Sequence, residues 1–327
     1  MKSHNSHLLG IRRIESSIHW STTSKRLKIF AAILIAAAGI VVAGATDFCD
    51  QTSRHALEAC QDSAESDKSV TLGKCDNITD PAARADCRQQ ATTDFQDAMQ
   101  TCQDQFEARQ AACQRLGPSR YDPVIDPANF VREVTNPYFP LPAGRTLIYE
   151  GQTADGFEHD EFIITRRTKV ILGVTCVEVH DLVYLDGELV EDTLDWFAQD
   201  RDGNVWYFGE NTGELQDGRF VTLEGTFTSG VNRDKPGIIM EAHPALRDFY
   251  RQEFSLENAE DFAEVVALNV TVRVPAGTYR HCLQTQETTP LETDLLEQKY
   301  YAMGVGNVLT VNSRNGDRVE LVRITMN

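Results

Sequence analysis

The stretch VEVHDLVYLDGELVEDTLDWFAQDRDGNVWYFGE, residues 177–210, decides the fold. Apolar and polar residues alternate along it, and the alternation is interrupted at Asp186-Gly187 and Asp202-Gly203. Alternation with a period of two predicts half-buried strands, and an Asp-Gly pair between such runs is a strong signal of a two-residue hairpin. The stretch therefore predicts three consecutive antiparallel strands.

The same signals recur on both sides of this stretch. Asp-Gly or Asn-Gly pairs stand at 155–156, 217–218 and 315–316, and strand-like runs continue from 263 to the C-terminal end of the sequence. Repeated hairpins of this kind predict an antiparallel meander of about ten to twelve strands. We expect a mainly β fold over residues 146–327, forming a barrel, half-barrel or sandwich.

Residues 46–117 differ in composition, because they contain few large apolar side chains and many Ala, Gln, Asp, Glu and Arg residues. Cysteines eleven residues apart return to the same face of a helix, which predicts a helical region. Disulfides would replace the missing core in such a region, which predicts a small disulfide-stapled helical hairpin. Its six cysteines are Cys49, Cys60, Cys75, Cys87, Cys102 and Cys113.

The disulfide connectivity is open, since six cysteines permit many pairings. An antiparallel alignment of the first four would join Cys60 to Cys75 and Cys49 to Cys87, but it leaves the last two on one helix, too far apart to bond. Two further cysteines, Cys176 and Cys282, fall in strand-like runs. We expect them to form an inter-sheet disulfide, with two buried thiols as the alternative.

Residues 1–45 have the pattern of a signal peptide. Three basic residues precede an unbroken apolar run at 29–44, which ends in small residues before Thr46. This pattern predicts cleavage near Ala45 and a secreted or periplasmic protein. The run is shorter than the ~20 apolar residues of a bilayer-spanning helix, so we expect no stable membrane insertion after cleavage. An uncleaved anchor is the alternative.

The net charge of the chain limits the classes of partner that it is expected to bind. The formal net charge is −18, and it becomes −23 when the six Lys or Arg and the one Glu of residues 1–45 are removed. Nucleic acid and anionic membrane surfaces attract positive patches, so a protein of this charge is not expected to bind them. Cations and basic partners remain compatible with it.

Residues 118–145 read as an extended linker. Its segment from Asn136 to Pro142 contains three prolines. Each proline fixes its own φ and pushes the residue before it out of the helical region, which predicts extended backbone. We expect the apolar residues of this segment to cover one end of the following sheet. A role as a recognition segment is the alternative.

The hairpin at 186–187 allows a prediction about the barrel interior. A two-residue turn there places Asp181 opposite Asp192 on the more apolar face, with Trp196 further along. Two opposed carboxylates resist joint ionisation unless they share a proton, bind a cation or meet a basic partner. We therefore predict Asp181 and Asp192 as ligand-binding residues. Three more candidates are Trp196, Tyr207 and Arg251.

The hairpin at 202–203 predicts a second group of carboxylates. It places Glu210 opposite Asp195, which the first hairpin places opposite Glu178. Three carboxylates in a row across three strands suit Ca²⁺ or Mg²⁺, with Ca²⁺ as the candidate, and we otherwise expect no cofactor. A solvated face without a metal is the alternative.

Two sets of motifs carry a resemblance. The run from Tyr300 to Gly306, YYAMGVG, is similar to the late hairpin of secreted bacterial half-barrel proteins, a group that includes lipoprotein carriers. The runs at 136–141, 195–200 and 203–210 resemble one uncharacterised exported β-rich family. The resemblance covers roughly residues 126–322. It implies a hydrophobic cavity for acyl chains but no specific ligand residues.

The sequence contains no H-E-x-x-H, G-x-S-x-G or P-loop motif. We therefore expect a non-enzymatic binding or carrier protein of the cell envelope, for an apolar or amphipathic small ligand. One alternative is a structural or assembly protein that contacts an envelope protein through the helical region. The other is a hydrolase or isomerase that uses the predicted carboxylate pair.

Overall fold

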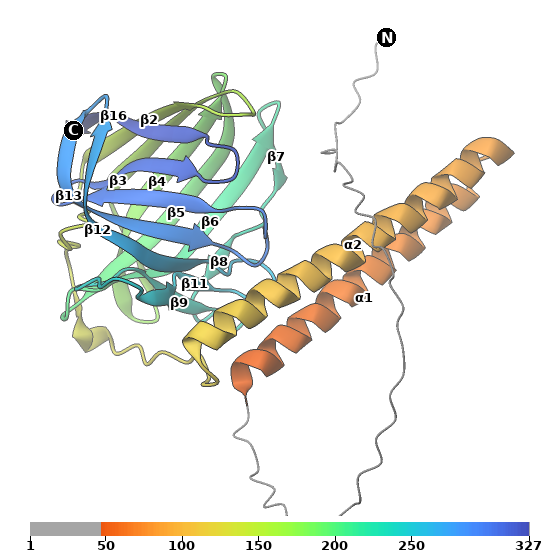
Figure 1. Ribbon diagram of the computed structural model, residues 1–327, viewed down its shortest axis with the longest axis horizontal. Helices are drawn as coiled ribbons and strands as arrows, with labels where there is room; N and C mark the ends of the chain where they lie inside the picture. The colour runs from red at the N-terminus through yellow and green to blue at the C-terminus, as the bar shows by residue number, and fades with distance from the viewer. Residues whose placement is uncertain (1–46, 327) are drawn as a thin grey trace, which may run out of the picture. The chain divides into compact units, whose positions relative to one another are not determined.

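The computed structural model describes residues 47–326, so the predicted leader at 1–45 lies outside the described residues. Two helices come first and an antiparallel sheet follows, as Figure 1 shows. The predicted mainly β fold with an N-terminal helical hairpin is confirmed. Within residues 47–326, neither helix is apolar enough to cross a bilayer.

The two helices are α1 (Phe48–Asp76) and α2 (Pro81–Leu116). Asp47 caps α1 by accepting a hydrogen bond from the backbone N–H of Asp50 at 2.9 Å, and Asp80 caps α2 in the same way. These carboxylates satisfy backbone donors that the first helical turn leaves unpaired. Each helix therefore begins where the sequence provides an Asp.

Three disulfides join α1 to α2. The bonds are Cys49–Cys113, Cys60–Cys102 and Cys75–Cys87, with Cα atoms 5.6 to 5.7 Å apart. The predicted pairs Cys60–Cys75 and Cys49–Cys87 are wrong, because the turn between the helices lies at 77–80 rather than between Cys60 and Cys75. At ~1.5 Å per residue, two cysteines fifteen residues apart on one helix are separated by about 22 Å.

The predicted Cys176–Cys282 disulfide is also wrong, because both residues are buried free thiols. Cys176 packs in a cluster with Trp196 and Phe208, whereas Cys282 packs in a different cluster with Val272 and Val308. The two thiols therefore belong to separate parts of the barrel wall. The alternative of two buried thiols is the one the structure supports.

The sheet contains sixteen strands, which Figure 1 shows wrapped around a common interior. They are β1 (Phe130–Val131), β2 (Arg145–Gln152), β3 (Phe157–Ile171), β4 (Val174–Leu185), β5 (Glu188–Asp200), β6 (Val205–Gln216), β7 (Arg219–Thr222), β8 (Phe227–Thr228), β9 (Lys235–Met240), β10 (Phe249–Arg251), β11 (Glu253–Phe254), β12 (Phe262–Val274), β13 (Gly277–Thr288), β14 (Glu297–Ala302), β15 (Gly306–Asn312) and β16 (Arg318–Met326). A 3₁₀ turn, η1 (Pro127–Asn129), precedes β1.

The sheet curls into a nearly closed barrel. Its main path runs β10-β12-β13-β14-β15-β16-β2-β3-β4-β5-β6-β9-β11, so its two ends are consecutive segments of the chain. Gln252 alone separates β10, which pairs with β12, from β11, which pairs with β9. A Cβ at Gly237 would lie 2.3 Å from the carbonyl of Gln252, so glycine is needed for this close approach.

All five predicted hairpin turns join antiparallel neighbours, from β2–β3 to β15–β16. At Asp186-Gly187 both residues have positive φ, 52° and 87°, as a primed two-residue turn requires. The turn signals therefore placed five pairs of neighbouring strands, four of which lie on the main path of the sheet.

One β-bulge changes which residues of β5 face inward. Next to the turn Tyr184 pairs with Leu189, but Val183 pairs with Glu191, so Val190 is an extra residue in β5. Beyond the bulge Asp181 lies opposite Thr193 instead of Asp192. A shift of one residue moves every following side chain of the strand to the other face of the sheet. The predicted Asp181–Asp192 pair is wrong for this reason.

The linker covers part of the barrel interior, as predicted. Val134 and Leu141 are buried in the main core cluster, and Phe139 packs edge-on against Phe162 and Phe197 with ring centroids 6.4 and 5.2 Å apart. The linker thus adds apolar and aromatic contacts that the strands do not supply.

A buried ion pair connects α2 to the barrel. The guanidinium of Arg109 donates to both carboxylate oxygens of Glu260, at 2.7 to 3.2 Å, and it lies 2.9 Å from a carboxylate oxygen of Glu257. Arg109 and Glu260 are only 3% and 2% exposed. This fork geometry fixes the register of α2 on the loop between β11 and β12.

Reduction of the three disulfides is expected to unfold the helical hairpin and leave the barrel folded. The helices bury chiefly Ala, Ser and Cys, and each native disulfide contributes about 2–5 kcal/mol. Far-ultraviolet circular dichroism should lose its helical component on reduction, while the fluorescence of Trp196 and Trp206 stays unchanged. A variant with Cys176→Ala and Cys282→Ala should respond alike. Simultaneous loss of both signals would contradict the expectation.

Replacement of Arg109 by Met is expected to lower the free energy of unfolding by about 3–5 kcal/mol, because Glu260 would be left buried without its partner. Urea denaturation measures the change. The matched control is Arg54→Met on α1, which removes an exposed pair with Asp50 and should have little effect. Equal effects of the two variants would show that Arg109 does not hold the helices to the barrel.

Candidate functional site

A cavity of about 670 Å³ lies inside the barrel. This volume is within the range of small-molecule sites, which are commonly ~300–1,000 Å³. Inward-facing side chains of β3 to β6 line one part of its wall. They are two positions apart on β3, β4 and β5, because alternate residues of a strand point to the same face, and three apart on β6, where the ladder with β5 shifts register. They are Asp160, Phe162, Asp181, Val183, Glu191, Thr193, Asp195, Phe197, Tyr207 and Glu210.

Aromatic rings form a continuous apolar surface in the cavity. Phe197 stacks on Tyr207 with ring centroids 4.7 Å apart and an interplanar angle of 16°, and Phe139 from the linker contacts Phe197. Leu141, Leu147 and Ile239 extend this lining. An apolar group of a ligand would find aromatic and aliphatic contacts here.

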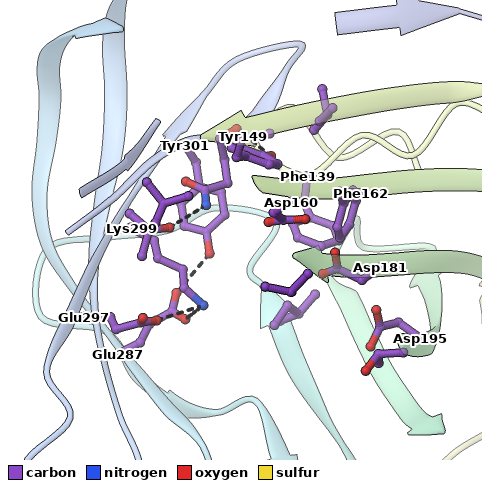
Figure 2. A pocket seen from close by; sticks show the side chains of 18 of the residues that line it. Phe139, Tyr149, Asp160, Phe162, Asp181, Asp195, Glu287, Glu297, Lys299 and Tyr301 are labelled. Atoms are coloured by element: carbon purple, nitrogen blue, oxygen red, sulfur yellow. Dashed lines mark hydrogen bonds and ion pairs between the residues drawn. The ribbon is translucent and has the colours of Figure 1, made fainter. Parts of the chain in front are cut away.

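A row of carboxyl groups lies next to the aromatic surface. Figure 2 shows Asp160, Asp181 and Asp195 along one side of the cavity, one from each of β3, β4 and β5. Burial raises the pKa of Asp160 to about 7, and it raises the pKa values of Asp181 and Asp195 well above their usual range. Near neutral pH these groups therefore hold protons that an exposed carboxyl would have released.

Asp160 and Asp181 form a coupled pair. After burial, the charge of Asp160 and a hydrogen bond with it are the next causes that raise the pKa of Asp181, whereas the same hydrogen bond lowers that of Asp160. Because the charge of one carboxylate disfavours ionisation of the other, the pair retains a shared proton. Asp195 instead accepts a hydrogen bond from the Tyr207 hydroxyl.

On the opposite side of the cavity, one lysine partly offsets the negative charge of two glutamates. Figure 2 shows Lys299 between Glu287 and Glu297, with its ammonium nitrogen 2.9 and 3.4 Å from their carboxylate oxygens. Burial alone would raise the pKa of Glu287, but the charge of Lys299 and hydrogen bonds from Thr285 and Tyr301 outweigh it and lower the pKa. Lys299 is thus occupied on its own side of the cavity.

Buried polar atoms without hydrogen-bond partners lie at the junction between β10 and β11. Gln252 and Glu253 both line the cavity and are 2% and 7% exposed. The side-chain nitrogen of Gln252 and one carboxylate oxygen of Glu253 have no hydrogen-bond partner among the described residues, and neither does one oxygen each of Asp160 and Asp181. Buried polar groups are nearly always paired, so we expect these atoms to bind water or a polar group of a ligand.

The bulge at Val190 determines which of the residues predicted for the site face the cavity. Asp181 and Tyr207 line the cavity as predicted, whereas Asp192 is on the outer face and accepts from His180 at 2.8 Å. Trp196 is also on the outer face, with the ammonium of Lys169 3.2 Å from its ring centroid. The inward aromatic residue of this strand is the next one, Phe197.

Arg251 does not reach the cavity. Its guanidinium lies 5.4 Å from the Tyr121 ring centroid and 4.8 Å from that of Phe262, and it donates to the sulfur of Cys49 on α1 at 3.8 Å. Burial lowers the pKa of Arg251. It therefore belongs to the contact between the helices and the barrel, which the prediction of an interior role did not anticipate.

The predicted carboxylate row for Ca²⁺ is split by the same bulge. Asp195 does lie opposite Glu210, as predicted, but Glu178 lies opposite Trp196 on the outer face, where it binds Arg167 at 2.6 Å. Among residues 47–326, no three His, Cys, Asp or Glu side chains are arranged to hold a metal ion. The three carboxylates therefore do not form one site.

Sequence reasoning missed Asp160, Lys299 and Glu253. Asp160 follows from alternation along β3 once Asp181 is placed inside, and Lys299 stands out as a basic residue beside the aromatic pair Tyr300-Tyr301. Glu253 had no local signal, because the kink at Gln252 that turns it inward depends on pairing with distant strands.

Comparison with known proteins identifies no family. No family model matches the chain, and no curated protein matches it. A crystal structure of a candidate lipoprotein from Parabacteroides distasonis is similar over 57% of this chain and 98% of that chain, with a TM-score of 0.33 and 12% identity. At that score the likeness does not establish a common fold, and no functional argument rests on it.

The stability of the protein is expected to fall as the pH rises from about 5 to about 8, by about 2 kcal/mol. With raised pKa values, the folded state binds more protons than the unfolded state in this range, so deprotonation favours unfolding. The pKa of Glu287 is lowered, so this residue affects the stability of the protein only below this pH range. Urea denaturation across this range measures the slope.

Asp160→Asn should flatten this pH dependence, because an amide has no proton to lose. Glu188→Gln in the exposed turn of β4–β5 should leave it unchanged. A free energy of unfolding that rises between about pH 5 and pH 8 would show that the interior carboxyls are not protonated in the folded protein.

Proposed function

We propose that this protein is an extracytoplasmic, non-enzymatic binding or carrier protein that holds a small amphipathic ligand inside its barrel. The observation that carries the proposal is the interior cavity, which combines an aromatic surface with buried polar atoms that have no partner among the described residues. Ligand sites are typically apolar pockets with a few convergent polar groups. The three disulfides support a location outside the cytoplasm.

A purely apolar ligand, such as an acyl chain alone, fits the cavity less well than an amphipathic one. It would displace water from Asp160, Asp181 and Glu253 without offering hydrogen bonds, and each unpaired buried polar group costs about 1–3 kcal/mol. Of the two ligand classes expected from the sequence, apolar and amphipathic, we therefore propose an amphipathic ligand.

The geometry of the barrel and the helices gives less support to the two alternative functions. A hydrolase or isomerase built on Asp181 and Asp192 loses its basis, since the two residues point to opposite faces. The use of the helical region as a surface for an envelope protein stays a prediction, because the contacts of α2 described above are with the barrel itself.

Native mass spectrometry of the protein purified from its own envelope fraction, before and after organic extraction, tests the proposal. We expect an organic mass that extraction removes. Val183→Phe places a larger side chain on the cavity wall and should reduce the bound fraction at least about tenfold, because a ligand cannot share the space that the ring occupies. The control Leu182→Phe changes the outer face of the same strand. A bare chain in the unmodified protein would contradict the proposal.

A further inference from the structure

The charges that line the cavity are strongly unbalanced. Its lining contains twelve Asp and Glu side chains and two basic ones, Arg145 and Lys299. A ligand that enters the cavity therefore meets a negative potential whenever the carboxyl groups ionise. This imbalance excludes organic anions as preferred ligands.

Both basic side chains of the lining are already engaged. Lys299 binds Glu287 and Glu297. The guanidinium of Arg145 donates to the backbone carbonyls of Gly304, Val305 and Pro140, at 3.1 Å and 2.8 Å for the first two. No ion pair among the described residues joins Asp160, Asp181, Asp195 or Glu253 to a basic side chain. These four carboxyls lack a cationic partner within the described part of the chain.

A second observation points independently to a bound group. Gln252 and Glu253, both more than nine-tenths buried, present an unpaired nitrogen and an unpaired oxygen on the cavity wall at the point where the barrel closes. Desolvating such atoms without a partner is unfavourable. A ligand with several hydrogen-bond donors would satisfy the oxygen atoms here and on the aspartates.

The chemistry of that ligand follows from the geometry. A metal ion is disfavoured, since no three oxygen-bearing side chains among the described residues converge as ligands. An ammonium group offers three N–H donors and a positive charge, which match carboxylate acceptors and gain strength in a buried site. Beside the aspartates, Phe139, Phe162 and Phe197 offer an apolar surface and ring faces that attract a cation.

Resting on the proposed function, we infer that the ligand is an amphipathic organic amine. Its ammonium group binds between Asp160, Asp181 and Asp195, and its apolar body lies against Phe139, Phe162 and Phe197. The amine enters as the cation R–NH₃⁺, and the proton that Asp181 shares with Asp160 leaves to solvent, so the charge of the site is conserved. No covalent bond forms or breaks in the ligand.

Proton release is a direct consequence of this exchange. The charged or titratable groups that face Asp181 are Asp160 on β3, Glu191 and Asp195 on β5, Tyr149 on β2 and Lys299 on β14. Burial and the neighbouring carboxylates keep the pKa of Asp181 high in the absence of a cation. A bound ammonium reverses that balance, so binding should release protons near neutral pH and become tighter as the pH rises.

A matched series of eight-carbon probes tests the inference by isothermal titration calorimetry with the mature full chain. Octylamine, octanol and octanoate share one apolar body and differ only in the polar group. We expect octylamine to bind at least about tenfold more tightly than either of the others, a difference typical of one charge-assisted hydrogen bond. Titrations in two buffers of different ionisation enthalpy should report release of protons.

Asp181→Asn should reduce the affinity for octylamine at least about tenfold and lower the number of protons released, whereas Asp192→Asn on the outer face should change neither. Because Asn resembles the protonated Asp181 in shape and charge, the variant is expected to fold. Asp160→Asn provides a second test of the same pair.

The outcomes separate this inference from the proposed function. Equal or tighter binding of octanol or octanoate would overturn the amine assignment and leave a binding protein with another ligand class. Tight octylamine binding that survives Asp181→Asn would place the amine elsewhere and overturn the site. Failure of all three probes would overturn the amine assignment, and a bare chain in native mass spectrometry would in addition remove the proposed function.

Discussion

The alternation of side chains along β3 to β6 is the constraint on which the interior of this barrel depends. Each residue of a strand faces either the cavity or the outside, so one unpaired residue exchanges the two sets for the rest of a strand. Val190 is that residue in β5. It brings Asp195 and Phe197 inside and sends Asp192 and Trp196 outside. A local irregularity of the sheet therefore decides which carboxyl and which aromatic ring of β5 face the cavity.

Much of the fold could be predicted from local patterns, and much of the site could not. The five turn signals marked the positions of the hairpins correctly, because Asp, Asn and Gly favour turns through their local backbone conformation. Only the turns at 186–187 and 217–218 have two residues, whereas the other three loops are longer. The Asp195–Glu210 pair was predicted correctly because two departures cancel. Next to the turn Phe197 pairs with Tyr207, one residue out from the expected alignment, and a register shift before Trp196 restores it. The bulge at Val190 has no such signature, because it depends on how β4 and β5 pack against the strands around them.

Contacts between distant segments explain the remaining misses. The helix cysteines pair across a turn whose position was marked by Asp80-Pro81, but the alignment chosen from their spacing placed the turn too early. Arg251 is held by residues from α1 and the linker, which no local pattern connects to it. Glu253 faces inward because the chain changes partner strands at Gln252. Each of these depends on long-range packing, where propensity and periodicity carry little information.

The nested arrangement of the three disulfides also bears on how an exported chain reaches its oxidised state. The loop closed by Cys75 and Cys87 lies within the loop closed by Cys60 and Cys102, and both lie within that of Cys49 and Cys113. None of the bonds crosses another, so the disulfides can form one after another, beginning next to the turn between the helices and proceeding outward. Because a thiolate must be exposed to attack a disulfide, the burial of Cys176 and Cys282 keeps the two thiols of the barrel wall out of thiol exchange with this ladder. In the folded protein, the two free thiols of the barrel wall are thus kept apart from the three disulfides of the helices.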